Sequence, residues 1–154
     1  MSAPAADEEQ LLLDFFTDDD WFPQPQGDGG VLGMRFEGRA GAFECFVELR
    51  RPPGQLLFYS VLPTHVAEPQ RLRMAEAITW LNESLLVGNF ELDLAAGQVR
   101  FKTSILLGEE PLPVPLLRQM VYINVTTMDR CQAILVEVTE SDEAPGDIAA
   151  QLWS

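Results

Sequence analysis

Residues 43–50 alternate between apolar and mostly polar side chains, and this period of two constrains the fold more than any other feature of the chain. The apolar positions are Phe43, Cys45, Val47 and Leu49. Successive side chains of an extended strand point to opposite faces, so the pattern predicts a strand with one buried and one wet face. Similar alternation occurs at residues 32–37, 90–94 and 99–105. Short turn segments link several of these runs, which favours an antiparallel sheet.

A fifth run, residues 56–62, is apolar on both faces and follows the turn Pro52-Pro53-Gly54. A strand buried on both sides belongs at the centre of a sheet. The sequence therefore predicts a five-stranded antiparallel sheet with this run inside it.

Three segments have helical features. The first begins near Asp7, which could cap it, with Gln10 completing a capping box. The second has Pro69 in its first turn, and Gly88 is a natural C-cap. The third would place six residues on one face, although its β-branched residues favour a strand by propensity. These six are Leu117, Met120, Asn124, Thr127, Cys131 and Leu135.

The predicted order is α-β-β-β-α-β-β-α, an α+β fold in a single domain spanning residues 1–154. Residues 1–6 are expected to form a flexible N-terminus. Residues 141–154 form an acidic tail that could hold a short helix. Its apolar patch, which includes Ile148, Leu152 and Trp153, could dock on a partner or on the chain itself.

Charge narrows the range of partners. Ten basic residues face 24 acidic ones, giving a net charge of −14. Such a surface repels nucleic acid and anionic membranes, and it attracts basic protein segments. Charge alone leaves a merely acidic protein and a charge-guided binding role equally open. The N-terminus lacks signal-peptide features and no run reaches the ~20 apolar residues of a membrane span, so we expect a cytoplasmic protein.

Reactive side chains are few. Cys45 and Cys131 match no disulfide framework or metal motif, and the alternation around Cys45 predicts a buried free thiol. His65 lies in a loop with no partner evident for acid–base chemistry, so a surface or capping role is favoured. Asp18, Asp19 and Asp20 continue into no calcium-loop ligand series, which favours a solvated turn.

Two other segments suggest a site only superficially. Gly27, Gly29, Gly30 and Gly33 lie in a Pro/Gly/Gln loop that precedes a strand, whereas a phosphate-binding loop follows one, so a flexible linker is predicted. Glu109-Glu110 fits a solvated loop equally well. We expect no metal, no cofactor and no catalytic residue.

The hairpin between residues 89 and 105 allows a prediction of register. Its apolar phase places Leu92 opposite Phe101 and Leu94 opposite Val99 on the core face. That register sets Asp93 opposite Arg100 and Glu91 opposite Lys102. These exposed pairs would fix the register more than they would add stability.

Residues 80–93 read WLNESLLVGNFELD, a string that resembles the signature of the bacterial YbjN family. The specific match covers residues 78–107, and residues 144–149 approximate a C-terminal element of the family. The motif residues, to which no role is assigned, are Asn82, Gly88, Asn89, Phe90, Glu91, Leu92 and Asp93. The resemblance implies a fold similar to type III secretion chaperones, with a five-stranded antiparallel sheet and often a homodimer. Family members are described as sensory transduction regulators, and no catalytic residue comes with the family.

These observations lead to one functional hypothesis and one rival. The hypothesis is a non-enzymatic regulatory or chaperone-like module, a homodimer that binds a protein or peptide partner. Apolar residues in excess on the second and third helices add to the case for a dimer. The rival is a small-molecule-binding protein or an enzyme whose site is built from dispersed carboxylates, which a pocket with shifted carboxylate pKa values would favour.

Overall fold

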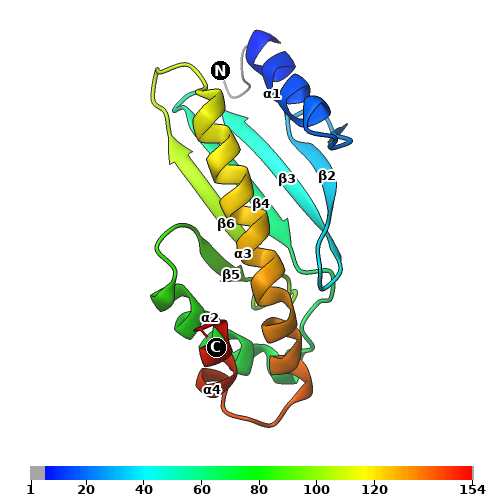
Figure 1. The fold of residues 1–154 in the computed structure, drawn as a ribbon, viewed down its shortest axis with the longest axis vertical. Coiled ribbons are helices and arrows are strands. Elements are labelled where there is room, and N and C mark those ends of the chain that lie inside the picture. The colour runs from blue at the N-terminus through cyan, green and yellow to red at the C-terminus, as the bar shows by residue number, and fades with distance from the viewer. Residues whose placement is uncertain (1–5, 154) are drawn as a thin grey trace.

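The computed structural model describes residues 6–153, and these form one antiparallel sheet with helices packed against it (Figure 1). The helices are α1 (Ala6–Asp18), α2 (Arg71–Ser84), α3 (Val114–Glu140) and α4 (Pro145–Ala149), with short 3-10 helices η1 (Glu68–Gln70) and η2 (Ala150–Trp153). The strands are β1 (Gln24–Pro25), β2 (Leu32–Glu37), β3 (Ala42–Arg50), β4 (Gln55–Val61), β5 (Asn89–Leu92) and β6 (Val99–Leu106).

The strands lie in the order β1-β2-β3-β4-β6-β5, and every neighbouring pair is antiparallel. The predicted α+β class with an antiparallel sheet is confirmed. The predicted count of five strands is wrong, because the sheet has six. The additional strand, β1, pairs Gln24 with Gly33 and Pro25 with Leu32 inside the presumed linker. Two residues are too few to show an alternation, so the sequence carries no signal for this strand.

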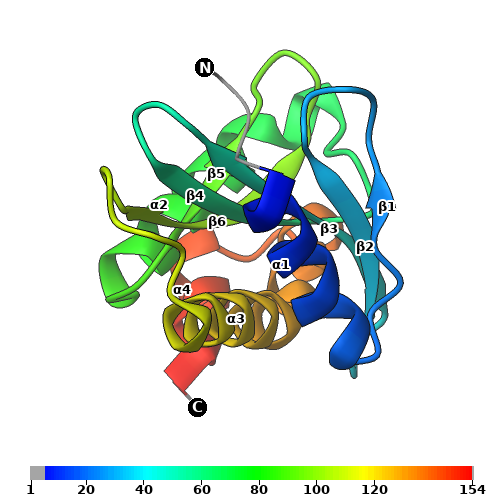
Figure 2. The ribbon, with the colours of Figure 1, turned by 90° about the horizontal axis from the view of Figure 1, so that it is seen from above.

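The sheet buries the face that the alternation predicts. Phe43, Cys45, Val47 and Leu49 are all at most 2% exposed. β4 lies between β3 and β6, which confirms the expected central strand. Figure 2 shows α1 and α3 on the same side of the sheet, where the core lies.

α3 is a continuous helix of 27 residues, despite its β-branched residues. Its buried face includes five of the six predicted residues, Leu117, Met120, Asn124, Cys131 and Leu135. Thr127, the sixth, is only half-buried. Burial of an apolar face outweighs the weak preference of single residues for a strand. Asn124 adds a polar contact within the core, because its Nδ2 donates to the Phe58 and Phe101 carbonyls at 3.0 and 3.1 Å.

Two predicted helix ends are wrong. α1 begins at Ala6, so Asp7 lies inside the helix, where its carboxylate accepts a bond from the Glu8 N–H. α2 ends at Ser84, and its C-cap is Leu85 and not Gly88. The next strand, β5, begins at Asn89. Gly88 instead has a φ of +79° directly before β5, where a Cβ atom would lie 2.6 Å from the Phe101 ring. Residues 1–5 of the expected flexible N-terminus lie outside the described residues.

The C-terminal segment folds back onto its own chain. It contains the short helix α4, and α4 contacts α2 and α3, with Ile148 and Leu152 buried. Arg73 of α2 donates to the carbonyls of Ser141 and Glu143, both at 2.8 Å. Gly146 lies against the indole of Trp80, so close that a Cβ atom there would be 2.8 Å from its Nε1. Ile148 and Leu152 of the tail's apolar patch therefore belong to the domain's own core, whereas Trp153 stays 64% exposed.

Candidate functional site

The motif residues lie where α2 meets the edge strand β5. The Oδ1 atom of Asn82 accepts a bond from the Phe90 N–H at 2.7 Å, and its Nδ2 atom donates to the Phe90 carbonyl at 3.1 Å. Unpaired backbone groups of an edge strand are a template for pairing with another chain. The Asn82 amide therefore closes the outer edge of β5 at Phe90, much as a neighbouring strand would.

The other motif residues stabilise the same joint. Phe90 is 2% exposed and its ring centroid lies 4.7 Å from that of Phe101. Glu91 accepts bonds from Arg100 Nε at 2.7 Å and Lys102 Nζ at 2.9 Å. Burial raises the pKa of Glu91, but the hydrogen bonds from Lys102 and Arg100 outweigh it, so the pKa lies below its ordinary value. These contacts give Asn82, Phe90 and Glu91 of the motif a structural role.

The predicted register of this hairpin is wrong by two residues. Phe90 lies opposite Phe101, Leu92 opposite Val99, and Glu91 opposite Arg100. Asp93 has left the strand, and its carboxylate accepts bonds from the N–H groups of Ala95 and Ala96. This turn makes the loop longer than the alternation suggests. A slip of two keeps the same faces, which is why the core partners are still apolar.

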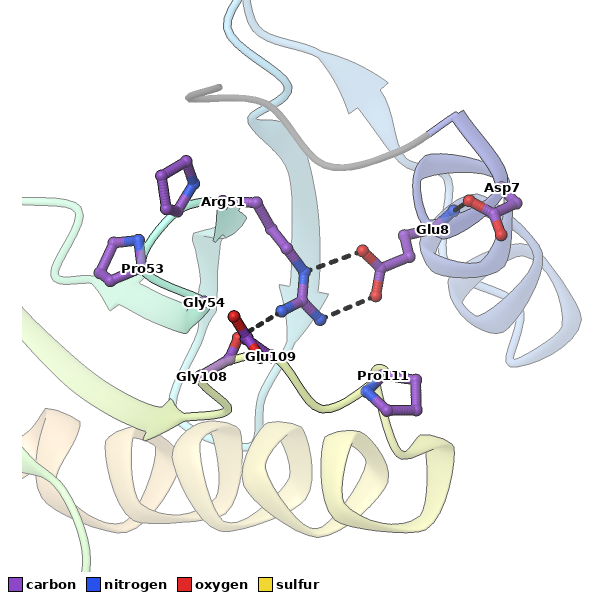
Figure 3. Close-up of a pocket in the computed structure, with 9 residues that line it drawn as sticks. Asp7, Glu8, Arg51, Pro53, Gly54, Gly108, Glu109 and Pro111 are labelled. Carbon is purple, nitrogen blue, oxygen red and sulfur yellow. Dashed lines mark hydrogen bonds and ion pairs between the residues drawn. The ribbon is translucent and has the colours of Figure 1, made fainter.

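A surface pocket lies between the start of α1, the turn after β3 and the loop after β6, and it encloses about 530 Å³ (Figure 3). Arg51 donates from Nε and Nη2 to the two carboxylate oxygens of Glu8, each at 2.9 Å. It also donates to the carbonyls of Gly108 and Glu110. The hydrogen bond from Arg51 holds the pKa of Glu8 below its ordinary value. Because Arg51 is already bonded on every nitrogen, it ties three segments together and is not poised to bind an anion.

The remaining candidates from the sequence are spread over the molecule. His65 is exposed and its Nδ1 lies 3.1 Å from the Ala96 carbonyl. Asp19 accepts bonds from the Trp21 indole and the Tyr122 hydroxyl, so it links the end of α1 to α3 and does not simply lie in solvent. Among residues 6–153, no three His, Cys, Asp or Glu side chains gather in a way that could hold a metal ion.

The two thiols are buried and free, as predicted for Cys45. Burial raises the pKa of Cys45 to about 12 and that of Cys131 to about 11. A thiol of this kind is not a nucleophile at neutral pH, because the thiolate is the reactive form. Glu8 and Glu91, the carboxylates with shifted pKa values, both have lowered values and sit in separate ion pairs. Neither has the raised pKa of a general acid.

One surface of α2 and the segment after it exposes several large apolar side chains. Within residues 71–87, all of which the structure describes, the large exposed side chains are Leu72, Trp80, Leu86 and Val87, at 79%, 51%, 99% and 50% exposure. The exposed charged residues are Glu76 and Glu83. We call these six residues the α2 face. Leu72 and Trp80 lie on α2, and Leu86 and Val87 lie in the segment that follows it. Exposed apolar side chains gathered on a helix and its flanking segment are typical of a protein-binding surface.

The sheet presents a second surface, on the side away from α3. The charged residues there are Arg35, Arg50, Arg100 and Lys102 with Glu37, Glu44, Glu48 and Glu91, and each takes part in an ion pair. We call this the outer sheet face. Four charges of each sign cancel, so the net charge of −14 lies elsewhere on the molecule.

The comparisons with known proteins identify the family. The model of the YbjN family, described as "Putative bacterial sensory transduction regulator", matches residues 9–135. The chain belongs to the YbjN family. No curated protein matches it. The predicted membership of the YbjN family is therefore confirmed.

Solved structures agree on the fold. The crystal structure of YbjN from E. coli, titled "a putative transcription regulator", has a TM-score of 0.61 and 13% identity, over 84% of this chain and 92% of that one. A chain of the HopA1-SchA chaperone-effector complex has a TM-score of 0.55 and 22% identity, over 84% of this chain and 99% of that one. At these identities the likeness shows the fold alone, which is the chaperone-like fold that the YbjN resemblance implies.

The structure also shows what sequence reasoning about a YbjN chain missed. The α2 face was not identified, although Leu72, Trp80 and Leu86 are plain in the sequence. A helical wheel places Met74, Ile78 and Leu81 on the buried side of α2. Leu72 and Trp80 are large apolar residues that fall outside this buried side, and that departure is the sequence signal for the α2 face.

None of the helices in residues 6–153 is long and apolar enough to cross a membrane.

Proposed function

We propose that this YbjN-family chain is a non-enzymatic, cytoplasmic, regulatory or chaperone-like module that binds a protein partner. The observation that carries the proposal is the α2 face, where Leu86 is 99% exposed and Leu72 79% exposed. Exposed apolar side chains that gather into one patch mark interaction sites. The similarity of the fold to a chain of a chaperone-effector complex supports the same conclusion.

The test is affinity capture from the source cells, followed by mass spectrometry, with the unchanged chain and a Leu72→Ser/Leu86→Ser variant. A protein held by the unchanged chain and lost by the variant would support the proposal. Leu106→Ser is the control for an exposed leucine outside α2, at 74% exposure on β6. Leu106 lies on the same side of the sheet as Arg50, so this variant should leave the partner bound and can change only self-association. Recovery of a metabolite with no specific protein would contradict the proposal.

We also propose that two copies associate through the outer sheet face. Its balanced, ion-paired charges allow two copies to meet there with no net repulsion, and a two-fold interface must be self-complementary. Strands about 4.8 Å apart, with about 3.3 Å per residue, give a face of roughly 20 by 23 Å. A face-to-face pair would then bury about 1,000 Å² in total, near the lower limit for specific interfaces.

Light scattering at micromolar concentration is expected to return about twice the chain mass of 17.2 kDa. Arg100→Glu should shift the equilibrium toward the monomer, because it removes the balance of charge on the outer sheet face. A monomer in the unchanged chain at that concentration would contradict the dimer.

The rival function, a small-molecule-binding protein, has one observation in its favour. The pocket beside Arg51 has a volume of about 530 Å³, within the range of ligand sites. A metabolite found by native mass spectrometry, and lost after Pro111→Ala, would favour it.

A further inference from the structure

The charge of the α2 face has one sign. Its exposed charged side chains are the carboxylates Glu76 and Glu83. Arg71 and Arg73, the basic residues of α2, are half-buried and donate to backbone carbonyls. Arg71 bonds to Val66, Leu94 and Ala95, and Arg73 to Ser141 and Glu143. The basic groups of α2 are therefore engaged within the fold, and its outer side offers carboxylates and apolar side chains.

The α2 face has the geometry of a helical stripe. Leu72, Glu76, Trp80 and Glu83 are spaced by four, four and three residues, so their side chains share one side of α2. Leu72 and Glu83 are separated by eleven steps along the helix, a rise of about 17 Å or about three turns. Leu86 and Val87 are also exposed, in the segment that follows the C-terminal end of the helix.

The segment that packs on α2 adds to the negative charge. α4 contacts α2, and Gly146 lies against the Trp80 indole. The next residue, Asp147, is exposed, as are Asp142 and Glu143 just before α4. Figure 1 shows α2 and α4 side by side at one end of the molecule. Glu76 and Glu83 thus belong to a larger acidic region with no exposed basic residue on either helix.

We propose that the α2 face binds a basic amphipathic helix of a partner protein. The proposal rests on the protein-binding function proposed above and specifies the chemistry of the partner. Leucine-like side chains of such a helix would cover Leu72, Trp80 and Leu86, while its lysine or arginine residues would meet Glu76 and Glu83. This is the mode by which an amphipathic helix docks on an apolar groove or face.

A second copy of this chain fits the α2 face poorly. Two copies would bring Glu76 and Glu83 together with the same carboxylates of the other chain, and like charges in a contact are unfavourable. The outer sheet face, with four charges of each sign, carries no such penalty. The α2 face carries only negative charge, so a basic partner provides the positive charge that complements it.

The experiment uses a labelled amphipathic helix of leucine and lysine, about 18 residues or ~27 Å long, and measures its binding to the full chain by fluorescence anisotropy. A peptide with glutamate in place of lysine is the comparison. The leucine–lysine peptide is expected to bind and the leucine–glutamate peptide is not. Glu76→Gln/Glu83→Gln should weaken binding about tenfold, from two lost charge contacts. Glu109→Gln/Glu110→Gln makes the same change of charge on a distant exposed loop, and it should weaken binding less than about twofold.

Leu72→Ser/Leu86→Ser should also weaken binding, whereas Leu106→Ser should not. All four variants change exposed side chains, so their unfolding midpoints should match that of the unchanged chain. Equal weakening by the two charge variants would mean general attraction to an acidic protein and would overturn the inference. A leucine–lysine peptide that does not bind the chain would also overturn the inference. So would a Leu72→Ser/Leu86→Ser variant that is a monomer where the unchanged chain is a dimer, since the α2 face would then join two copies. A client retained by both α2 variants in affinity capture would also overturn the inference while leaving the protein-binding function intact.

Discussion

Asn82→Ala removes the two hydrogen bonds that close the edge of β5. The Phe90 N–H and C=O would lose partners at 2.7 and 3.1 Å, beside a ring that is only 2% exposed. Each lost bond to a partly buried backbone group costs about 1–1.5 kcal/mol, so the free energy of unfolding should fall by about 2–3 kcal/mol. For a domain of this size, that corresponds to a decrease of roughly 5–10 °C in the thermal midpoint. Urea unfolding followed by tryptophan fluorescence measures the change.

Asn89→Ala is the control, because its amide reaches the same Phe90 carbonyl only at 3.4 Å. It should cost less than about 1 kcal/mol. Asn82→Asp can still accept from the Phe90 N–H, but it places a carboxylate oxygen against the carbonyl, so it should not restore stability. If Asn82→Ala unfolded at the same urea concentration as the unchanged chain, packing alone would hold β5 and the explanation of the motif would be wrong.

Three other outcomes follow from the buried and paired groups. Glu8→Gln should lower the free energy of unfolding by about 1–3 kcal/mol at pH 7, since both partners of the Glu8–Arg51 pair are less than one-fifth exposed. The pKa of Glu8 is lowered in the folded protein, so the stabilisation by its carboxylate is present above pH 4.5, the ordinary pKa of the group, and is lost as the pH falls below it. The free energies of unfolding of the unchanged chain and of Glu8→Gln, measured by urea titration, should therefore converge in acid. Asn124→Leu should lower the free energy of unfolding by about 2–4 kcal/mol, because the Phe58 and Phe101 carbonyls and the Thr103 hydroxyl lose a buried partner. Thr126→Ala, on the exposed side of α3, should lower it much less in the same urea titration. Cys45 and Cys131 should resist a thiol reagent in the native protein at pH 8, since burial raises their pKa values to about 12 and 11, and rapid labelling without denaturant would show that the core opens.

Periodicity predicts the central part of this fold well. Phe43, Cys45, Val47 and Leu49 identify β3 and its buried face because one side of a sheet must be apolar. The same reasoning cannot distinguish registers that differ by two residues. Leu92 faces Val99 because Asp93 makes a turn and Arg71 binds the carbonyls of Leu94 and Ala95. Such contacts between distant segments have no local signature.

Tertiary contacts also account for the other differences. β1 forms because Gln24 and Pro25 meet β2 across a glycine-rich turn, and Gly88 is required by the approach of Phe101 and not by a helix end. The motif could be recognised in the sequence, but the bond from Asn82 to Phe90 appears only once α2 lies beside β5. The exposed side of α2 could have been predicted from the helical spacing of its buried residues, since Leu72 and Trp80 depart from it.

Photo-crosslinking in the source cells tests the central claim, that this protein works by binding another protein through the α2 face. A crosslinking amino acid replaces Leu86, at 99% exposure, or Leu106, at 74% exposure on β6. Position 86 should give an adduct with a second, different protein whose crosslinked segment is basic and amphipathic. Position 106 should give at most a pair of identical chains. Adducts with a different protein from position 106 alone, or none but self-adducts from position 86, would contradict the account.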